Sequence, residues 1–455
     1  MRAADSGQDG SPADKLARRH AFHVERVACD RCGAIYGPFK LAVDETASCP
    51  LCRAELCKHD NFPVQTWLAL SLAGLMVFVL ANLYPVAVMR VSGMARSATL
   101  LQAVGVTWRQ GYEAVALMSL LAGFVLPFML LAATLWVLIP LSQNRLAPGF
   151  VLATRFIHAV SPWCMVQVFL LGALVAVIKL ADMAAIQAGA GLYAFAALMV
   201  LLTLLRRIDA RVLWRHAHDQ GLVAHPEPHA GEGEALTGCA VCGLVQAVPV
   251  GEKAVGCLRC RAPVRFRKPD HVGRTWALIA AAAILYVPAN LLPVMHVTTL
   301  FGGTTTHTIM GGVVDLWRAG SMDVAVIVFI ASVVVPLTKL LALAALLVAA
   351  QRDSTENLRA RTRLYETVEF IGQWSMLDVF VVVLLSALAD FPGLSQIHAG
   401  SGAAAFGLVV LLTMLAAMSY DPRRAWDAAV DELDLGSQSA APRGIGHKEA
   451  LDGRT

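Results

Sequence analysis

The chain has 455 residues, of which 57% are hydrophobic and only 15% are charged. A soluble globular chain averages about 45–50% apolar and about 25% charged residues, so this composition excludes an ordinary soluble enzyme and an intrinsically disordered protein. The formal net charge of +4 is too small to indicate a nucleic-acid partner. These values predict a protein that crosses a membrane several times.

Cysteines form two clusters, each built from a pair of CxxC motifs. Such pairs are typical of a zinc ribbon, in which four thiolates hold the ion tetrahedrally and leave no open position for catalysis. Disulfides or a redox dithiol are the alternatives, but a cytosolic location disfavours structural disulfides. We therefore predict two structural zinc sites, with iron as the substitute metal. The motifs are Cys29-x2-Cys32 with Cys49-x2-Cys52, and Cys239-x2-Cys242 with Cys257-x2-Cys260.

Eight apolar stretches follow the first cluster in two groups of four. Residues 1–66 contain no apolar run, so we expect no signal peptide. Each stretch approaches or exceeds the roughly 17–25 residues that cross a bilayer as a helix. The stretches cover residues 67–89, 113–141, 156–181, 189–205, 275–296, 322–350, 366–389 and 401–419.

The two groups repeat one another at an offset of 208 to 212 residues. So many ordered matches indicate a true repeat. Because each group holds an even number of stretches, both groups face the same way and the repeat is parallel. The matches are Trp67 and ANLYP (81–85) with Trp276 and ANLLP (289–293), Trp108 with Trp317, Pro127 with Pro336, Trp163 with Trp374, and Asp209 and Trp214 with Asp421 and Trp426.

The positions of Lys and Arg near the ends of the stretches predict the orientation. The loop at 351–365 carries four arginines, whereas the short loops at 182–188 and 390–400 carry no Lys or Arg. Both termini and both cysteine clusters are therefore expected in the cytoplasm.

We accordingly expect an all-α polytopic membrane protein with two parallel units of four helices, each preceded by a cytoplasmic four-cysteine ribbon. The expected domains are a flexible tail (1–24), the first ribbon (25–60), the first unit (61–215), a linker (216–235), the second ribbon (236–268), the second unit (269–430) and a disordered tail (431–455).

Lys339 and Asp378 are charged residues inside apolar stretches of the second unit. Lys339 lies twelve residues before the loop that begins at Gln351, and Asp378 lies thirteen after the loop ends at Tyr365. At about 1.5 Å per residue their depths are roughly 18 and 20 Å, so the two side chains are expected to meet near the midplane.

Three further residues are expected to complete this polar site. Ser332 is seven residues before Lys339, and Ser375 is three before Asp378, so each pair shares a helix face. Thr413 lies in the last stretch. Pro336 cannot donate to the carbonyl of Ser332, and this leaves an acceptor to be satisfied.

The ANLxP element is expected to end a helix, since proline disfavours helix at the residue before it. In the second unit this element contains Asn290 and Pro293, and the asparagine either caps the freed carbonyls or lines an opening to lipid. The chain contains no phosphate-binding loop, no HExxH and no GxSxG motif, and we do not expect an enzyme.

These features together resemble the paraquat-inducible protein A family over about residues 25–430. The residues that carry the resemblance are the two ribbons, the doubled ANLxP element, Ser332-x3-Pro336-x2-Lys339, the run 374–380 and Asp421-Pro422-Arg423 with Trp426. The resemblance implies an inner-membrane protein that passes phospholipid to or from a periplasmic MCE-domain tunnel partner. The first unit departs from the pattern, because it has Gly123, Leu130, Cys164 and Gln167 where the second has Ser332, Lys339, Ser375 and Asp378.

Two other functions remain open from the residues alone. One is a membrane-anchored zinc or redox sensor, in which the ribbons respond and the helices only anchor. A buried charge pair is costly in a mere anchor and disfavours this interpretation. The other is a proton- or ion-coupled carrier of another substrate. The polar site itself has two interpretations, a structural pair that locks two helices or a pair that protonation or a lipid headgroup breaks.

Overall fold

The computed structural model describes residues 22–41, 45–58, 62–91, 94–181, 185–224, 226, 229–251, 253–299, 303–318, 320, 322–352, 357–372, 377–388 and 395–427. The predicted tail at 431–455 lies outside the described residues, as do residues 1–21 of the predicted tail at 1–24.

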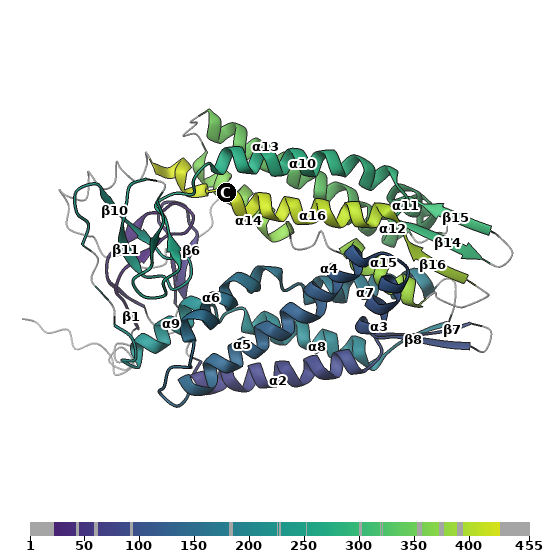
Figure 1. Cartoon of the computed structure of the whole chain (residues 1–455), viewed down its shortest axis with the longest axis horizontal. Coiled ribbons are helices and arrows are strands. Elements are labelled where there is room, and N and C mark those ends of the chain that lie inside the picture. The colour runs from purple at the N-terminus through teal and green to yellow at the C-terminus, as the bar shows by residue number, and fades with distance from the viewer. Residues whose placement is uncertain are drawn as a thin grey trace, which may run out of the picture.

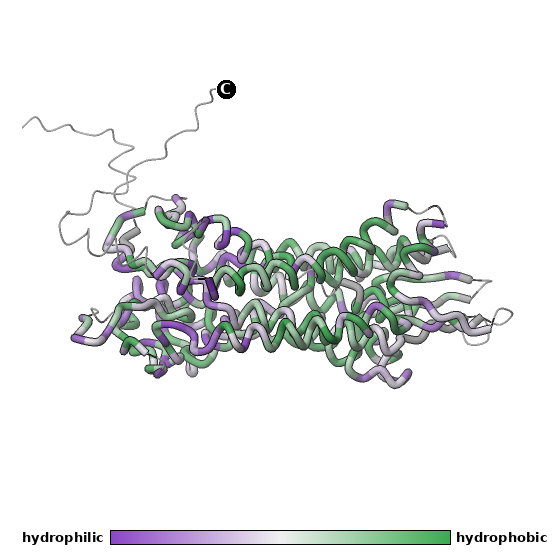
Figure 2. The backbone as a smooth tube through the Cα atoms, turned by 90° about the horizontal axis from the view of Figure 1, so that it is seen from above, coloured by the Kyte–Doolittle hydropathy of each residue, from purple (hydrophilic) through white to green (hydrophobic). Residues whose placement is uncertain are grey.

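Apolar helices run side by side along the long axis of the molecule (Figure 1). Hydrophobic residues gather in the middle of this axis and hydrophilic residues at both ends (Figure 2). The prediction of a mainly helical protein that crosses a membrane several times is confirmed. Within the described ranges, six helices are long and apolar enough to span: Val64–Leu83, Glu113–Leu141, Phe150–Ile178, His271–Leu291, Ala325–Gln351 and Ser401–Trp426.

The other two expected stretches take a different form. Helix α8 (Ala190–Leu205) reaches spanning length only together with α9 (Ala210–Asp219), and the pair bends by 52°. The stretch at 366–389 is divided between α14 (Leu358–Gly372) and α15 (Leu377–Leu388). Residues 379–388 of α15 are all buried. Because protein surrounds α15, it does not need the length of a helix that faces lipid.

The described elements follow a similar order in both units, except that η2 has no described counterpart in the second unit and that the first unit ends in an α-helix and the second in a 3-10 helix. The first unit contains α2 (Val64–Leu83), β7 (Ala87–Val91), β8 (Met94–Ala98), α3 (Leu100–Arg109), α4 (Glu113–Leu120), η1 (Leu121–Val125), α5 (Leu126–Leu141), α6 (Phe150–Val160), η2 (Ser161–Trp163), α7 (Val166–Ala181), β9 (Ala185–Ala188), α8 and α9. The second contains α10 (His271–Leu291), β14 (Met295–Thr299), β15 (Gly303–His307), α11 (Ile309–Arg318), α12 (Met322–Phe329), η3 (Ile330–Val334), α13 (Val335–Gln351), α14, α15, β16 (Ser395–Ala399), α16 (Ser401–Ser419) and η5 (Pro422–Trp426).

Each unit has a three-stranded antiparallel sheet, in the order β8-β7-β9 and β15-β14-β16. Both sheets lie at the same end of the helices (Figure 1). The α2-to-β7 and α10-to-β14 connections both arrive at that end, so the two units run in the same direction.

The two ribbons lie at the opposite end (Figure 1). They consist of short antiparallel pairs: β1 with β4, β2 with β3, β5 with β6, β10 with β11, and β12 with β13. The strands are β1 (Phe22–Val24), β2 (Val27–Ala28), β3 (Ile35–Tyr36), β4 (Phe39–Leu41), β5 (Thr46–Ser48), β6 (Glu55–Lys58), β10 (Glu234–Gly238), β11 (Val245–Pro249), β12 (Val255–Gly256) and β13 (Pro263–Val264).

Helix α15 joins the two units. It packs against α7 and α3 of the first unit, and Phe380 meets Phe169 edge to face with 5.4 Å between ring centroids. The hydroxyl oxygens of Ser386 and Thr107 lie 3.1 Å apart in the same interface. The helix that begins beside Asp378 is therefore held between the units.

Candidate functional site

Each CxxC motif forms a tight turn around its first cysteine. In the first ribbon, Gly33 N–H donates to Cys29 O and Arg53 N–H donates to Cys49 O, each at 2.8 Å. Gly33 and Arg53 have φ values of 81° and 65°, and this left-handed conformation explains a glycine in the leading turn. The second ribbon repeats the turns at Gly243 and Arg261.

The four sulfurs of each cluster converge on one point. In each cluster all four lie within 4.8 Å of one another and all four cysteines are buried. Cys29 and Cys52 sulfurs are 3.5 Å apart, as are those of Cys239 and Cys260. Zinc with Zn–S bonds of about 2.3 Å would place tetrahedral sulfurs about 3.8 Å apart. The donor set and its spacing therefore fit one four-coordinate metal ion in each ribbon.

Two other groups of the first ribbon bear on cysteine chemistry. The hydroxyl oxygen of Tyr36 is 3.1 Å from the sulfur of Cys49. Burial raises the pKa of Tyr36, so the hydroxyl keeps its proton and is available to donate to a thiolate. Burial also raises the pKa of the Cys57 thiol, which lies outside the cluster. Cys57 is therefore a poor nucleophile.

The first ribbon docks on the second unit. Arg31 pairs with Glu369 of α14 at 2.8 Å, and Arg359 Nε donates to Leu51 O at 2.8 Å. Trp426 packs among the four cysteines of the first cluster. The N-terminal ribbon thus contacts the C-terminal part of the chain.

The second ribbon docks on the first unit. Arg259 lies over the ring of Trp214, 5.2 Å from its centroid, and donates to the Trp214 carbonyl at 3.0 Å. Trp214 and Trp426 occupy matching repeat positions, and each donates its indole N–H to a buried threonine of its own unit, Thr154 at 3.1 Å and Thr362 at 3.0 Å. The first ribbon therefore packs on Trp426 at the end of the second unit, and the second ribbon packs on Trp214 at the end of the first unit.

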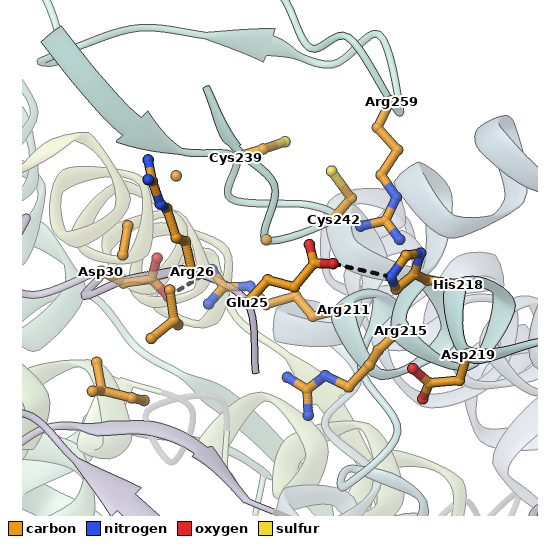
Figure 3. A pocket seen from close by; sticks show the side chains of 15 residues that line it. Glu25, Arg26, Asp30, Arg211, Arg215, His218, Asp219, Cys239, Cys242 and Arg259 are labelled. Atoms are coloured by element: carbon orange, nitrogen blue, oxygen red, sulfur yellow. Dashed lines mark ion pairs between the residues drawn. The ribbon is translucent and has the colours of Figure 1, made fainter. Parts of the chain in front are cut away.

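The ribbons also meet each other around Arg211 of α9 (Figure 3). Arg211 Nη2 pairs with Asp30 of the first ribbon at 2.6 Å and donates to Ala240 O of the second at 3.2 Å. A methyl group on Gly238 would stand 2.7 Å from Cβ of Ala28, so only glycine permits this contact. Arg211 thus links the first unit to both ribbons.

The predicted polar site is only partly within the described residues. Lys339 is 2% exposed, and no described residue provides a hydrogen-bond partner for its ammonium group. Ser332 is fully buried. Thr413 is buried on α16 and donates to Val410 O at 2.9 Å. Ser375 and the side chain of Asp378 lie outside the described residues, so the meeting of Lys339 with Asp378 stays a prediction.

Gly372 and Tyr286 belong to this region and were not anticipated. A methyl group on Gly372, the last residue of α14, would stand 3.0 Å from Lys339 Nζ, so the ammonium lies against the break between α14 and α15. Tyr286 donates its hydroxyl to Val333 O at 3.2 Å. Val333 belongs to the π-helical turn η3, which directly precedes α13 and Pro336, where a backbone donor is missing.

The ANLxP element ends α10 and contacts the start of α16. Asn290 donates to Tyr286 O at 2.8 Å, and Pro293 O accepts from Gly402 N–H at 3.0 Å. A methyl group on Gly400 would stand 2.0 Å from Pro293 O. Gly189 and Gly191 make the same approach to Pro85. The signal in the sequence was a GxG pair before the last apolar stretch of each unit.

Comparison with known proteins covers nearly the whole chain. The family model described as paraquat-inducible protein A (PqiA) matches residues 64–218 and 272–429. Intermembrane transport protein PqiA of Escherichia coli K12 is 34% identical over 414 residues, which are 90% of this chain and 97% of the relative. Lipophilic envelope-spanning tunnel protein A of the same organism is 31% identical over 88% of this chain and 91% of its own length. A probable intermembrane transport protein of Haemophilus influenzae is 28% identical over 91% and 98%. No solved structure matches the chain.

Proposed function

Because this chain belongs to the paraquat-inducible protein A family, we propose that it is an inner-membrane transport component that passes phospholipid between the inner membrane and a periplasmic MCE-domain tunnel partner. The names of its relatives support transport between membranes through an envelope-spanning system. These relatives are named as transport proteins, which supports a role other than catalysis.

The observation that carries the transport mechanism is the burial of Lys339 in the membrane region. A charge at the bilayer centre costs at least about 2.5–3.5 kcal/mol on insertion scales, so it persists only with a compensating role. Lys339 lies against Gly372, six residues before Asp378 and three before Ser375. We assign Lys339 and Asp378 as the working pair, with Ser332, Ser375 and Thr413 around it. Protonation, or the binding of a lipid headgroup, breaks the pair between Lys339 and Asp378. The loss of this pair is coupled to a conformational change of the protein.

The place of α15 supports this coupling. The helix begins beside Asp378 and packs between the two units through Phe169 and Thr107. A change in the charge state near its first turn acts directly on the interface between the units. The π-helical turn at Ser332 adds an irregular backbone segment that can change its hydrogen bonds at low cost.

The proposal places the ribbons and both termini in the cytoplasm and the two sheets in the periplasm, where the sheets and the loops around them (residues 90–112 and 297–321) meet the partner. Arg359, one of the four arginines at 351–365, lies at the ribbon end, since it donates to Leu51 O of the first ribbon. Each ribbon holds one zinc ion as a structural centre, with iron as the possible substitute.

Complementation of a strain whose growth depends on this transport tests the proposal. Lys339→Ala and Asp378→Asn should each abolish growth while the protein still accumulates, folded, in the membrane. Lys253→Ala and Asp323→Asn make the same chemical changes at exposed positions and should complement fully. If both site variants complement, the polar site has no working role. If both are degraded, the pair is structural.

A further inference from the structure

Two neighbouring cavities lie in the first unit, around Arg206, which directly follows α8. A cavity of about 710 Å³ is bounded by the first ribbon, by the turn at residues 206–209 and by α9. It adjoins an apolar cavity of about 170 Å³ inside the unit, and His158, Arg206 and Asp209 line both. A polar cavity and an apolar cavity therefore lie next to each other where the apolar helix α8 ends.

The polar cavity is rich in cations. Its lining contains five cationic side chains and three carboxylates. Two of the carboxylates already accept within the protein, Asp30 from Arg211 at 2.6 Å and Asp209 from Val212 N–H at 2.9 Å. Arginine forks bind phosphate oxygens in pairs. The cationic residues are Lys58, Arg206, Arg207, Arg211 and Arg215.

The second unit provides a comparison within the same chain. At the repeat positions of Arg206 and Arg207 it has Met418 and Ser419. Arg423, the counterpart of Arg211, donates two hydrogen bonds of 3.0 Å to its own neighbour Asp421. In the second unit this arginine pairs with a carboxylate of its own turn, whereas Arg211 pairs with Asp30 of the first ribbon. The positive-inside rule, by which Lys and Arg keep loops in the cytoplasm, applies to both units alike. It therefore does not explain why only the first unit has arginines at the positions of Arg206 and Arg207.

The apolar cavity occupies the repeat position of the polar site. Leu130, Cys164 and Gln167, which line it, match Lys339, Ser375 and Asp378. The first unit thus has apolar space where the second has a buried charge. A cationic cavity beside an apolar one, at the end of an apolar helix, suits a molecule with a phosphate head and a hydrocarbon tail.

We propose that this cavity pair binds the phosphate headgroup of an anionic phospholipid from the cytoplasmic leaflet, with Arg206 and Arg207 at the phosphate and the start of the hydrocarbon in the apolar cavity. The inference rests on the proposed lipid function and deepens it, because it names the lipid class and assigns lipid binding to the first unit. It requires nothing of Lys339 or Asp378.

Native mass spectrometry of the delipidated full-length protein, titrated with phosphatidylglycerol or phosphatidylcholine, tests the site. We expect about tenfold tighter binding of phosphatidylglycerol, because its headgroup has a net negative charge, whereas phosphatidylcholine also carries a quaternary ammonium that the cationic lining repels. Arg206→Gln with Arg207→Gln should remove this preference. Arg145→Gln, which removes one positive charge from an exposed loop of the same unit, should keep it. Lys339→Ala should also keep it, which separates this site from the proposed transport mechanism.

Arg206 Nη2 lies 3.5 Å from Cys164 O, so its replacement can affect folding. Arg207→Gln with Arg215→Gln retains that contact and should also remove the preference, at an unchanged thermal midpoint without lipid. Equal affinity for both lipids in the unaltered protein, or an unchanged preference in the second double variant, overturns the proposal. If inorganic phosphate displaces phosphatidylglycerol and binds as tightly alone, the site binds free phosphate and the lipid assignment is wrong.

Discussion

Arg31 in the first CxxC turn forms an ion pair with Glu369 of α14 at 2.8 Å, across 338 residues of sequence. The guanidinium of Arg31 also lies 5.2 Å from the ring centroid of Tyr365, one turn earlier in the same helix. Because the second ribbon rests on Trp214 of the first unit, each ribbon contacts the unit that follows the other ribbon in the chain. A movement of the first ribbon therefore changes its contacts with the second unit, and a movement of the second ribbon changes its contacts with the first unit.

The first prediction concerns this ion pair. Arg31→Ala or Glu369→Ala should speed amide exchange in the first ribbon by about two- to fivefold, since partly exposed pairs contribute about 0.2–1 kcal/mol. The Arg31 and Glu369 side chains are 27% and 51% exposed, so a larger effect is not expected. Hydrogen exchange followed by mass spectrometry measures it. Lys40→Ala, on an exposed part of the same ribbon, is the control. Unchanged exchange in both variants would show that the pair does not hold the ribbon.

The second prediction concerns the metal. The purified chain should contain about two zinc ions, and Cys32→Ser with Cys49→Ser should reduce this to about one, because four thiolates hold each ion. Elemental analysis under reducing, chelator-free conditions measures the content. Cys57→Ser is the matched control, since it removes a buried thiol of the same ribbon outside the cluster. A metal content near zero in the unaltered protein would contradict the prediction.

The third prediction separates the position of Lys339 from its presence. Gly372→Ala adds a methyl group 3.0 Å from Lys339 Nζ and 3.4 Å from its Cε, so the side chain must shift. Alanine stabilises a helix by about 1 kcal/mol relative to glycine, and we therefore expect normal accumulation with reduced transport-dependent growth. Gly312→Ala in α11 has no atom within 4 Å of the new methyl group and should grow normally. Full growth of the Gly372 variant would show that the ammonium tolerates displacement.

The fourth prediction concerns the contact between the ANLxP element and α16. Gly400→Ala should destabilise the protein by about 1–3 kcal/mol or more, because the methyl group would stand 2.0 Å from a backbone oxygen that cannot move freely. The backbone angle of Gly400, φ of −108°, suits alanine, so the cost is steric. Thermal unfolding of purified variants measures it. Gly105→Ala, which lies inside α3 with open space around the new methyl group, should unfold at the same temperature as the unaltered protein or higher.

The fifth prediction concerns orientation. A cysteine at Thr304, exposed on β15, should react with an impermeant thiol reagent in intact cells whose outer membrane has been made permeable. A cysteine at Gln143, exposed in the loop between α5 and α6, should react only after the inner membrane is lysed. The reverse pattern would place the ribbons in the periplasm.

The sequence by itself determined the features that depend on local spacing and composition. Runs of apolar residues predict spanning helices because the thickness of the bilayer sets their length. Paired CxxC motifs predict the cysteine clusters because each turn places two sulfurs together within a few residues, and both clusters are present. The matching order of motifs predicted a repeat, and the order of the described elements is similar in the two units.

Only the tertiary structure decided which distant segments meet. Nothing local to Arg31 indicates Glu369, because an exposed arginine has many equivalent partners until the fold brings one near. The break between α14 and α15 could not be seen in a continuous apolar stretch, since a helix buried by protein and a helix facing lipid have the same composition. Gly372 and Gly400 were missed for a related reason. Lys339 leaves little room for a side chain at Gly372, and the carbonyl of Pro293 leaves none at Gly400. These contacts form only when the segments pack, so the local sequence does not indicate them.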